Sequence, residues 1–236
     1  NILSLKGCDT SNISGAIIGS VVPVIGNALK NAVITLLGIE PLMLGPGIKT
    51  GLNIKIDNPA QLGADLAAGA VGALEKYPLP SIIIDMGTAT TISVLDRNGA
   101  FLGGTIGAGV RMTLKALAEG TAALPAIGIS SPKSVIGRNT VDCMQSGIVL
   151  GTAAMLDGII DRIEEELGEM ATVVATGGLS KEIFPIFPPR YSLRSITEAL
   201  SVFTSPPRIS IPLSLPISSR ISQGIHSCIS LIFLSL

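Results

Sequence analysis

One short segment combines a carboxylate, a glycine and several hydroxyls, and it reads Asp85-Met-Gly-Thr-Ala-Thr-Thr91. Apolar stretches at 81–85 and 90–95 flank it, so we expect a hairpin between two strands. Gly87 lets the backbone turn tightly and brings amide groups within reach of a ligand. Those amides favour an anion, the Thr88 hydroxyl adds a donor, and Asp85 is suited to a cation that accompanies phosphates. The segment therefore indicates a phosphate-handling turn, and the alternative is an ordinary Gly-Thr hairpin.

A second carboxylate, Asp65, lies in the run Gly63-Ala-Asp-Leu66, within a stretch of small apolar residues. Asn58 can cap a helix there, and we expect that helix to continue toward residue 76. Helical spacing would then bring Leu62 and Leu66 close to the face that carries Asp65. Phosphoryl transfer to a hydroxyl needs a base that orients the hydroxyl and accepts its proton. Asp65 is a candidate for that base, and the alternative is a plain surface acid.

Two further turns contain residue types that suit a ligand. Gly177-Gly178 follows an apolar strand expected at 172–176 and permits close backbone approach, as at the adenosine of a nucleotide. Such pairs are common after strands, so the pattern by itself is weakly specific. The run Gly137-Arg-Asn-Thr140 predicts a turn before a helix, and Thr140 can either cap that helix or contact a ligand.

The elements that must position these residues alternate between strands and helices. Strands are expected at 16–22, 81–85, 90–95, 100–104 and 172–176, and helices at 24–37, 114–124 and 146–167. The strands are rich in Val and Ile, and continuous apolar runs of this kind are typical of a buried parallel sheet. A mean hydropathy of +0.61 and a charged fraction of only 14% agree with such a sheet. We therefore expect an α/β fold.

Net charge, hydropathy and cysteine content limit the kinds of partner and compartment that we expect. A net charge of -1 gives no basic surface for nucleic acid. No run of about 18 apolar residues is free of helix breakers, so we expect no membrane-spanning helix. The three cysteines are far apart and have no metal-ligand spacing, which is typical of a protein of the reducing cytoplasm.

The character of the sequence changes after Phe187. Six prolines interrupt a background of Ser, Ile and Leu, and no helical or strand period lasts more than a few residues. We expect residues 188–236 not to be native-like sequence. The alternative is a flexible tail, although tails are seldom so apolar.

Taken in order, these motifs resemble the type III pantothenate kinases, enzymes of the actin-like fold that open coenzyme A synthesis. The resemblance covers about residues 13–183. The motifs that carry it are Val21-Val-Pro, Gly45-Pro-Gly-Ile-Lys-Thr-Gly, Asp57-Asn-Pro, Gly63-Ala-Asp, Asp85-x-Gly-Thr-Ala-Thr-Thr, Gly103-Gly-x-Ile-x-x-Gly, Thr121-Ala-x-Leu-Pro, Ile136-Gly-x-Asn-Thr and Ala175-Thr-Gly-Gly. The ordered set is far more specific than any one motif.

The resemblance implies an α/β, actin-like (ribonuclease H-like) ATPase fold with two related lobes. The first lobe is expected at 1–80 and to be incomplete, and the second at 81–187. The implied activity is transfer of the γ-phosphoryl group of ATP to the primary hydroxyl of pantothenate, which gives 4′-phosphopantothenate. Members of this family use Mg²⁺ with ATP, require K⁺ or NH₄⁺, and act as cytoplasmic homodimers.

The resemblance also implies roles for single residues. Asp65 would accept the proton of the attacking hydroxyl, and Asp85 would bind the monovalent cation. The pantothenate site would be lined by Gly63, Ala64, Asp65 and Leu66, and Thr140 would contact pantothenate across the dimer interface. ATP would be contacted by Gly87 and Thr88.

Three departures from the family pattern leave alternatives open. No Asp-x-Gly-Asn-Thr hairpin precedes Asp9, so an N-terminal segment is expected to be missing. Leu66 stands where the family usually has an arginine, and Ile56 where many members have a tyrosine. The alternatives are a non-catalytic nucleotide-binding or regulatory relative, and an actin-like kinase for another hydroxy acid.

Overall fold

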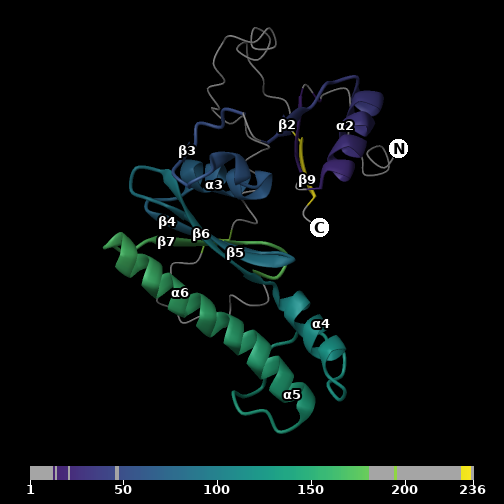
Figure 1. Ribbon diagram of the computed structural model, residues 1–236, viewed down its shortest axis with the longest axis vertical. Helices are drawn as coiled ribbons and strands as arrows, with labels where there is room; N and C mark the ends of the chain where they lie inside the picture. Colours follow the sequence, from purple (N-terminus) through teal and green to yellow (C-terminus); the bar gives the residue numbers. More distant parts are fainter. Residues whose placement is uncertain are drawn as a thin grey trace. The chain divides into compact units, whose positions relative to one another are not determined.

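The computed structural model of the chain describes residues 13, 15–20, 22–45 and 48–180, together with the backbone of 194–195 and 230–234. Figure 1 labels the elements, which fall into two compact units. Unit 1 consists of residues 1–75 and 197–236, and unit 2 of residues 76–196. The expected lobes at 1–80 and 81–187 stay predictions. The prediction about 188–236 concerns residues that lie outside the described part, two short strands excepted.

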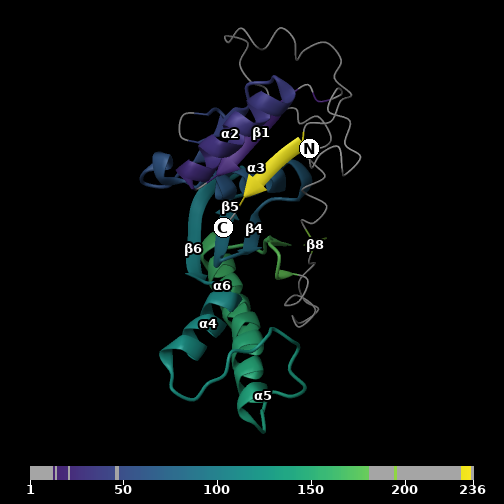
Figure 2. The ribbon, with the colours of Figure 1, turned by 90° about the vertical axis from the view of Figure 1, so that its right-hand side faces the viewer.

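Unit 1 contains a short parallel sheet. β1 (Ala16–Ser20) lies between β2 (Leu42–Leu44) and β9 (Ser230–Leu234), and its Ile18 is in register with residues 43 and 232. Figure 2 shows β9 as the yellow arrow of this unit. α2 (Pro23–Leu37) connects β1 to β2, and β3 (Asn53–Ile54) follows. Pro23 suits the first turn of α2, and Gly38 ends the helix in the left-handed conformation at φ 67°. The expected helix at 24–37 is confirmed.

The helix expected from Asn58 onward is interrupted. Asn58 does cap a turn, since its side chain accepts a hydrogen bond from the Ala60 N–H at 3.2 Å, but that turn is the short 3-10 helix η2 (Pro59–Gln61). Leu62 then takes extended backbone angles (φ -66°, ψ 119°), and α3 (Ala64–Lys76) begins after Gly63. Leu62 is therefore not on the helix that carries Asp65, and the expectation that they share a helical face is wrong.

Unit 2 contains a mixed sheet. The strands β6 (Ala100–Ala108), β5 (Ala89–Leu95), β4 (Ser81–Met86), β7 (Thr172–Thr176) and β8 (Arg194–Ser195) follow one another in that order across the sheet. β4, β5 and β6 form an antiparallel meander, while β7 runs parallel to β4. In this register Asp85 lies opposite Thr91 on one side and Thr176 on the other. The strands expected at 81–85, 90–95 and 172–176 are confirmed.

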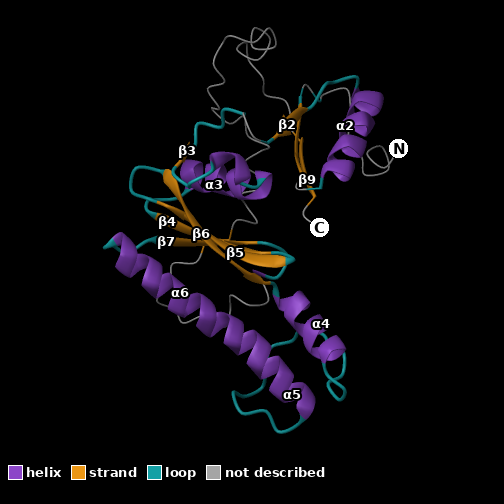
Figure 3. Ribbon diagram, viewed as in Figure 1, coloured by secondary structure: helices purple, strands orange, loops and turns teal. Residues whose placement is uncertain are grey.

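α4 (Val110–Gly120) starts directly after β6, four residues before the start expected from the sequence, and ends at Thr121 in extended conformation. β6 is also longer than expected and reaches Ala108. Figure 3 shows α4 and α6 (Gly151–Leu167) as the two longest helices of unit 2, with α6 running along the sheet. Buried side chains of both helices and of the sheet form one core cluster, which includes Ile82, Ile84, Ile92, Val110, Leu114, Leu156, Ile160 and Val173.

The helix that precedes α6 changes its winding. α5 (Thr140–Gln145) passes through the π-turn η3 (Ser146–Leu150) into α6. Met144 and Val149 are both buried although they are five residues apart, a spacing that would place them on different faces of an α-helix. Because a π-turn holds more residues than an α-turn, both side chains reach the same core.

By length and composition, one described helix, Thr140–Leu167, is long and apolar enough to cross a membrane, since an 18-residue window of it has a mean hydropathy of 1.4. The sequence expectation of no such helix did not anticipate this segment. Leu156 and Ile160 on it are fully buried in the core of unit 2. Packing in the core of unit 2 thus covers part of this helix, and 33% of its apolar window is buried.

Candidate active site

The turn between β4 and β5 brings the first candidate residues together. The Gly87 N–H donates to the Ala89 carbonyl at 3.0 Å, which closes the hairpin tightly. Asp85 is half-buried at the end of β4, and Thr88 is exposed at the tip. The hairpin expected from the sequence is confirmed, and its exposed tip leaves the Thr88 side chain accessible to a ligand.

The N-terminus of α4 lies against this turn. The Gly109 N–H donates to the Thr88 carbonyl at 3.1 Å, and a Cβ on Gly109 would lie 2.2 Å from that oxygen and 2.6 Å from the Gly87 carbonyl. Only glycine fits such an approach. The sequence analysis assigned no role to Gly109, although this glycine is the last residue of the Gly103-Gly-x-Ile-x-x-Gly motif. Its position in that motif, shortly after the DxGT turn, was the signal that could have pointed to it.

The end of β7 lies against the other side of the turn. Gly177 has a φ of 91°, and a Cβ there would lie 2.5 Å from the Met86 nitrogen and 2.6 Å from Asp85 Oδ1. The Leu179 N–H donates to the Met86 carbonyl at 3.4 Å. The close approach expected at the glycine pair thus occurs at Gly177 and against Asp85, whereas Gly178 is exposed with open space around it. A contact of this pair with adenosine stays a prediction.

The surroundings of Asp85 suit a hard cation. Its Oδ1 lies close to the Gly177 backbone, where an added Cβ would approach it to 2.6 Å. Carboxylate oxygens are ligands that hard cations prefer. Across the described ranges no group of three or more His, Cys, Asp or Glu side chains is placed to hold a metal ion. A cation at Asp85 stays a prediction.

Asp65 lies in the first turn of α3 in unit 1. It is half-buried between the buried residues Ala64 and Ala67. The Ala67 N–H donates to the Gly63 carbonyl at 3.0 Å, so Gly63 starts the helical hydrogen-bond pattern. A carboxylate in the first turn is favoured by the helix dipole. Gly63, Ala64, Asp65 and Leu66 are thus held together by one helix start.

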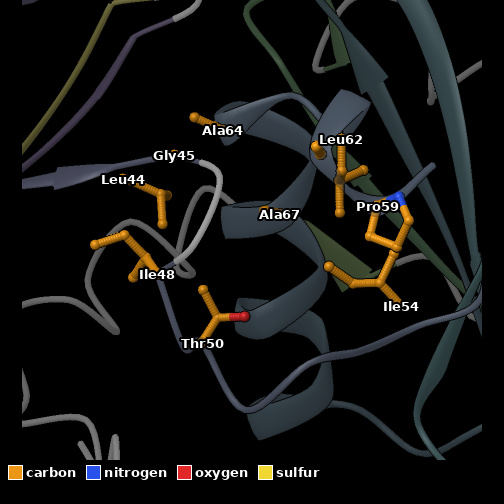
Figure 4. Close-up of a pocket in the computed structure, with 10 residues that line it drawn as sticks. Leu44, Gly45, Ile48, Thr50, Ile54, Pro59, Leu62, Ala64 and Ala67 are labelled. Atoms are coloured by element: carbon orange, nitrogen blue, oxygen red, sulfur yellow. The ribbon is translucent and has the colours of Figure 1, made fainter.

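A pocket of about 180 Å³ borders this helix start (Figure 4). Residues of the β2–β3 connection, of η2 and of α3 line it, namely Leu44, Gly45, Ile48, Thr50, Ile54, Pro59, Ala60, Leu62, Ala64 and Ala67. The only polar side chain in this lining is that of Thr50, whose hydroxyl accepts from the Leu52 N–H at 3.3 Å. The pocket therefore suits a branched apolar group better than a charged one. Nothing in the sequence pattern singled it out.

Thr140 is the first residue of α5 and is exposed. The cap of this helix is Asn139, whose Oδ1 accepts from the Asp142 N–H at 2.9 Å. The suggestion that Thr140 serves as the cap is therefore wrong, since the asparagine before it takes that place. The Thr140 side chain remains available for another contact.

Known proteins match most of the length of the chain. The family model described as Type III pantothenate kinase matches residues 1–162. Among curated relatives, Type III pantothenate kinase of Exiguobacterium sibiricum is 46% identical over 175 residues, which cover 74% of this chain and 69% of the relative. The protein of the same name from Moorella thermoacetica is 42% identical over 180 residues, covering 76% and 71%.

A solved structure has a similar fold. The crystal structure of a conserved putative Baf family transcriptional activator from Campylobacter jejuni aligns with a TM-score of 0.53 over 84% of this chain and 82% of that one, at 18% identity. This likeness concerns the fold alone. Together with the family match, it confirms the expected α/β, actin-like fold class.

Proposed function

The chain belongs to the type III pantothenate kinase family, ATP-dependent enzymes of coenzyme A biosynthesis, and we propose that it transfers the γ-phosphoryl group of ATP to the primary hydroxyl of pantothenate with Asp65 as the proton acceptor. The observation that carries this assignment is the position of Asp65. Its carboxylate lies in the first turn of α3, and two alanines of that turn, Ala64 directly before it and Ala67 two residues after it, line an apolar pocket.

The pocket supports pantothenate as the acceptor. Pantothenate carries two methyl groups on the carbon beside its primary hydroxyl, so a branched apolar group adjoins the atom that is phosphorylated. An apolar pocket next to a carboxylate matches that chemistry, because the methyl groups are buried while the hydroxyl faces the base. Gly63, Ala64 and Leu66 would line pantothenate together with Asp65.

The hairpin of unit 2 supports a phosphate site. We assign the ATP contact to Gly87 and Thr88, because the tip of the turn is exposed while the backbone behind it is fixed by Gly109 and Gly177. A turn that does not need to rearrange can stabilise charge as it develops on the phosphoryl group. Thr140, exposed at the start of α5, is proposed to contact pantothenate.

Asp85 is the residue that would hold the monovalent cation, K⁺ or NH₄⁺, through its carboxylate. Such a cation supplies positive charge beside the phosphates. We assign Mg²⁺ to the ATP phosphates themselves, since no carboxylate cluster is present within the described ranges.

We further propose that the protein acts as a homodimer in the cytoplasm. Four large apolar side chains of unit 2 are each more than 70% exposed, namely Ile106, Val135, Ile136 and Met170, and a partner subunit would remove such side chains from water. Cysteines without paired spacing support a reducing compartment.

The test is an assay of ATP-dependent phosphorylation of pantothenate by the protein that contains this sequence. The release of ADP is measured in the presence of K⁺. Asp65→Asn is expected to lower kcat by at least about 100-fold, because it removes the proton acceptor. Its thermal midpoint should stay near that of the wild type, since asparagine is also tolerated near a helix start. Unchanged kcat in Asp65→Asn would remove Asp65 from the mechanism, and absence of any turnover by the wild type would reject the activity.

A further inference from the structure

Side-chain hydrogen bonds hold the segment that leads into α5, residues 134–140. We call it the 134–140 arm. Ser134 Oγ donates to the Ile136 carbonyl at 2.8 Å, and Ser146 Oγ donates to the Val135 carbonyl at 2.5 Å. Ser146 is only 7% exposed and belongs to the π-turn η3. A buried hydroxyl on the helix therefore fixes a carbonyl of the arm.

The second half of the arm packs directly on the first turn of α5. A Cβ at Gly137 would lie 2.4 Å from the Cys143 nitrogen and 2.7 Å from the Asp142 carbonyl carbon. Asn139 is bound through both ends of its amide, because Oδ1 accepts from the Asp142 N–H and Nδ2 donates to Asp142 Oδ2 at 2.7 Å. The backbone around residue 138 consequently has little freedom to move.

Arg138 and Thr140 are the chain neighbours of Asn139. The Asn139 backbone is extended (φ -145°, ψ 167°), and Thr140 already belongs to α5. Both Arg138 and Thr140 are exposed. Because an arginine side chain is long and flexible, a ligand that contacts the Thr140 hydroxyl lies within reach of a guanidinium two residues earlier.

Arg138 has no competing partner among the described residues, where none of the ion pairs and hydrogen bonds involves it. The acceptor named above carries a carboxylate at the end opposite to its reacting hydroxyl. Neither the pocket lining nor residues 63–66 include a lysine or arginine. A cation for that carboxylate therefore comes from outside these two sets, where Lys49 and Lys55 beside the lining and Arg138 beside Thr140 are the candidates.

We propose that Arg138 binds the carboxylate of pantothenate and makes the enzyme specific for the acid over neutral analogues. The inference rests on the proposed function, and on Thr140 as a pantothenate contact. A guanidinium can bind a carboxylate through two parallel hydrogen bonds, which gives orientation as well as affinity. The hydrogen bonds of the arm fix the backbone from which this group extends, so only the arginine side chain has to be ordered on binding.

The experiment compares two acceptors, pantothenate and pantothenol, the neutral alcohol in which a hydroxymethyl group replaces the carboxylate. Arg138→Gln is expected to raise KM for pantothenate by at least about tenfold and to leave KM for pantothenol and for ATP within about twofold, because only a charge-assisted bond is lost. Arg138→Lys should recover part of the loss, since it restores the charge without the bidentate geometry.

Lys133→Gln is the matched control, because Lys133 is an exposed cation of the same loop with no ion pair among the described residues. It should change neither KM. An equal effect of Arg138→Gln on both acceptors, or no effect on pantothenate, overturns the proposal while leaving the kinase activity in place. If the wild type phosphorylates neither acceptor, the proposed function fails. Calorimetric binding of pantothenate then tests Arg138 separately. Equal affinities of the wild type and Arg138→Gln, or no binding by either protein, would reject the proposed role of Arg138.

Discussion

In unit 2, Asp85 lies among backbone segments packed so closely that a methyl group on Gly109 or Gly177 would overlap its neighbours. In unit 1, Asp65 lies on a helix whose glycines, Gly69 and Gly72, have no atom within 4 Å of an added Cβ, and an apolar pocket borders the start of that helix. The first carboxylate is positioned by contact of main chains. The second is positioned by a helix start with room beside it.

The difference matches the two tasks. A phosphate turn depends on fixed N–H groups, and any displacement of the backbone spoils them. An acceptor pocket has to admit and release a small molecule, so space is part of its function. We therefore expect substitution of Gly109 or Gly177 to be harmful and glycine substitution on α3 to be tolerated, and added volume on α3 to change binding rather than folding.

The largest effect is expected for Gly177→Ala. The new methyl would overlap the Met86 nitrogen and Asp85 Oδ1, and alanine is disfavoured at a φ of 91°. We expect a loss of about 2–4 kcal/mol, a thermal midpoint lower by on the order of 10 °C, and ATP-dependent turnover reduced by more than about 100-fold. Calorimetric melting and steady-state kinetics measure both. Gly178→Ala is the control, since its Cβ meets nothing within 4 Å, and equal damage by both variants would contradict the account of a tight turn.

An intermediate effect is expected for Ala67→Leu. Ala67 lines the pocket beside Asp65, and a leucine side chain would fill part of its volume of about 180 Å³. KM for pantothenate should rise by about tenfold, which corresponds to about 1.4 kcal/mol, while KM for ATP stays unchanged. A rise in both KM values together with a lower melting temperature would mean that the helix, not the pocket, has been disturbed.

Three strands of unit 2, β4, β5 and β7, could be predicted because each is rich in Ile, Val or Thr and bounded by turn residues, whereas the Gly-rich second half of β6 could not. The break before α3 could not, because Asn58 and Pro59 are good start signals for a helix and nothing local reveals that Leu62 turns extended. The same limit applies to Thr140, since Asn139 and Thr140 are both suitable caps, and only the hydrogen bond to Asp142 decides between them.

Parts of the candidate site depend on contacts between distant segments. Gly87 and Gly177 could be identified from their motifs, but the overlap of Gly177 with Asp85 requires β7 to lie beside β4. Gly109 was visible only as the end of a motif without a role. The pocket of unit 1 is formed by three separate stretches of chain, and periodicity in any one of them carries no sign of it.

The smallest effect is expected for Gly69→Ala, and it has the opposite sign to that of Gly177→Ala. Gly69 lies inside α3 with no atom within 4 Å of an added Cβ. Alanine is more favourable than glycine in a helix interior, so stability should rise by about 0.5–1 kcal/mol with unchanged kinetics. Chemical denaturation would detect the gain. Destabilisation by this variant would mean that α3 is packed as tightly as the turn around Asp85, and the contrast between the units would disappear.

Because η3 is a π-turn, the number of residues at 146–150, rather than their types, sets which side chains at the start of α5 face solvent. Removing one residue between 146 and 150 would turn α5 by about 100° about its axis relative to α6. The Ser146 bond to the arm would be lost, and Arg138 and Thr140 would face another direction although neither had been substituted. A relative whose sequence is one residue shorter at this point could therefore differ in acceptor preference while every residue of its arm stayed identical.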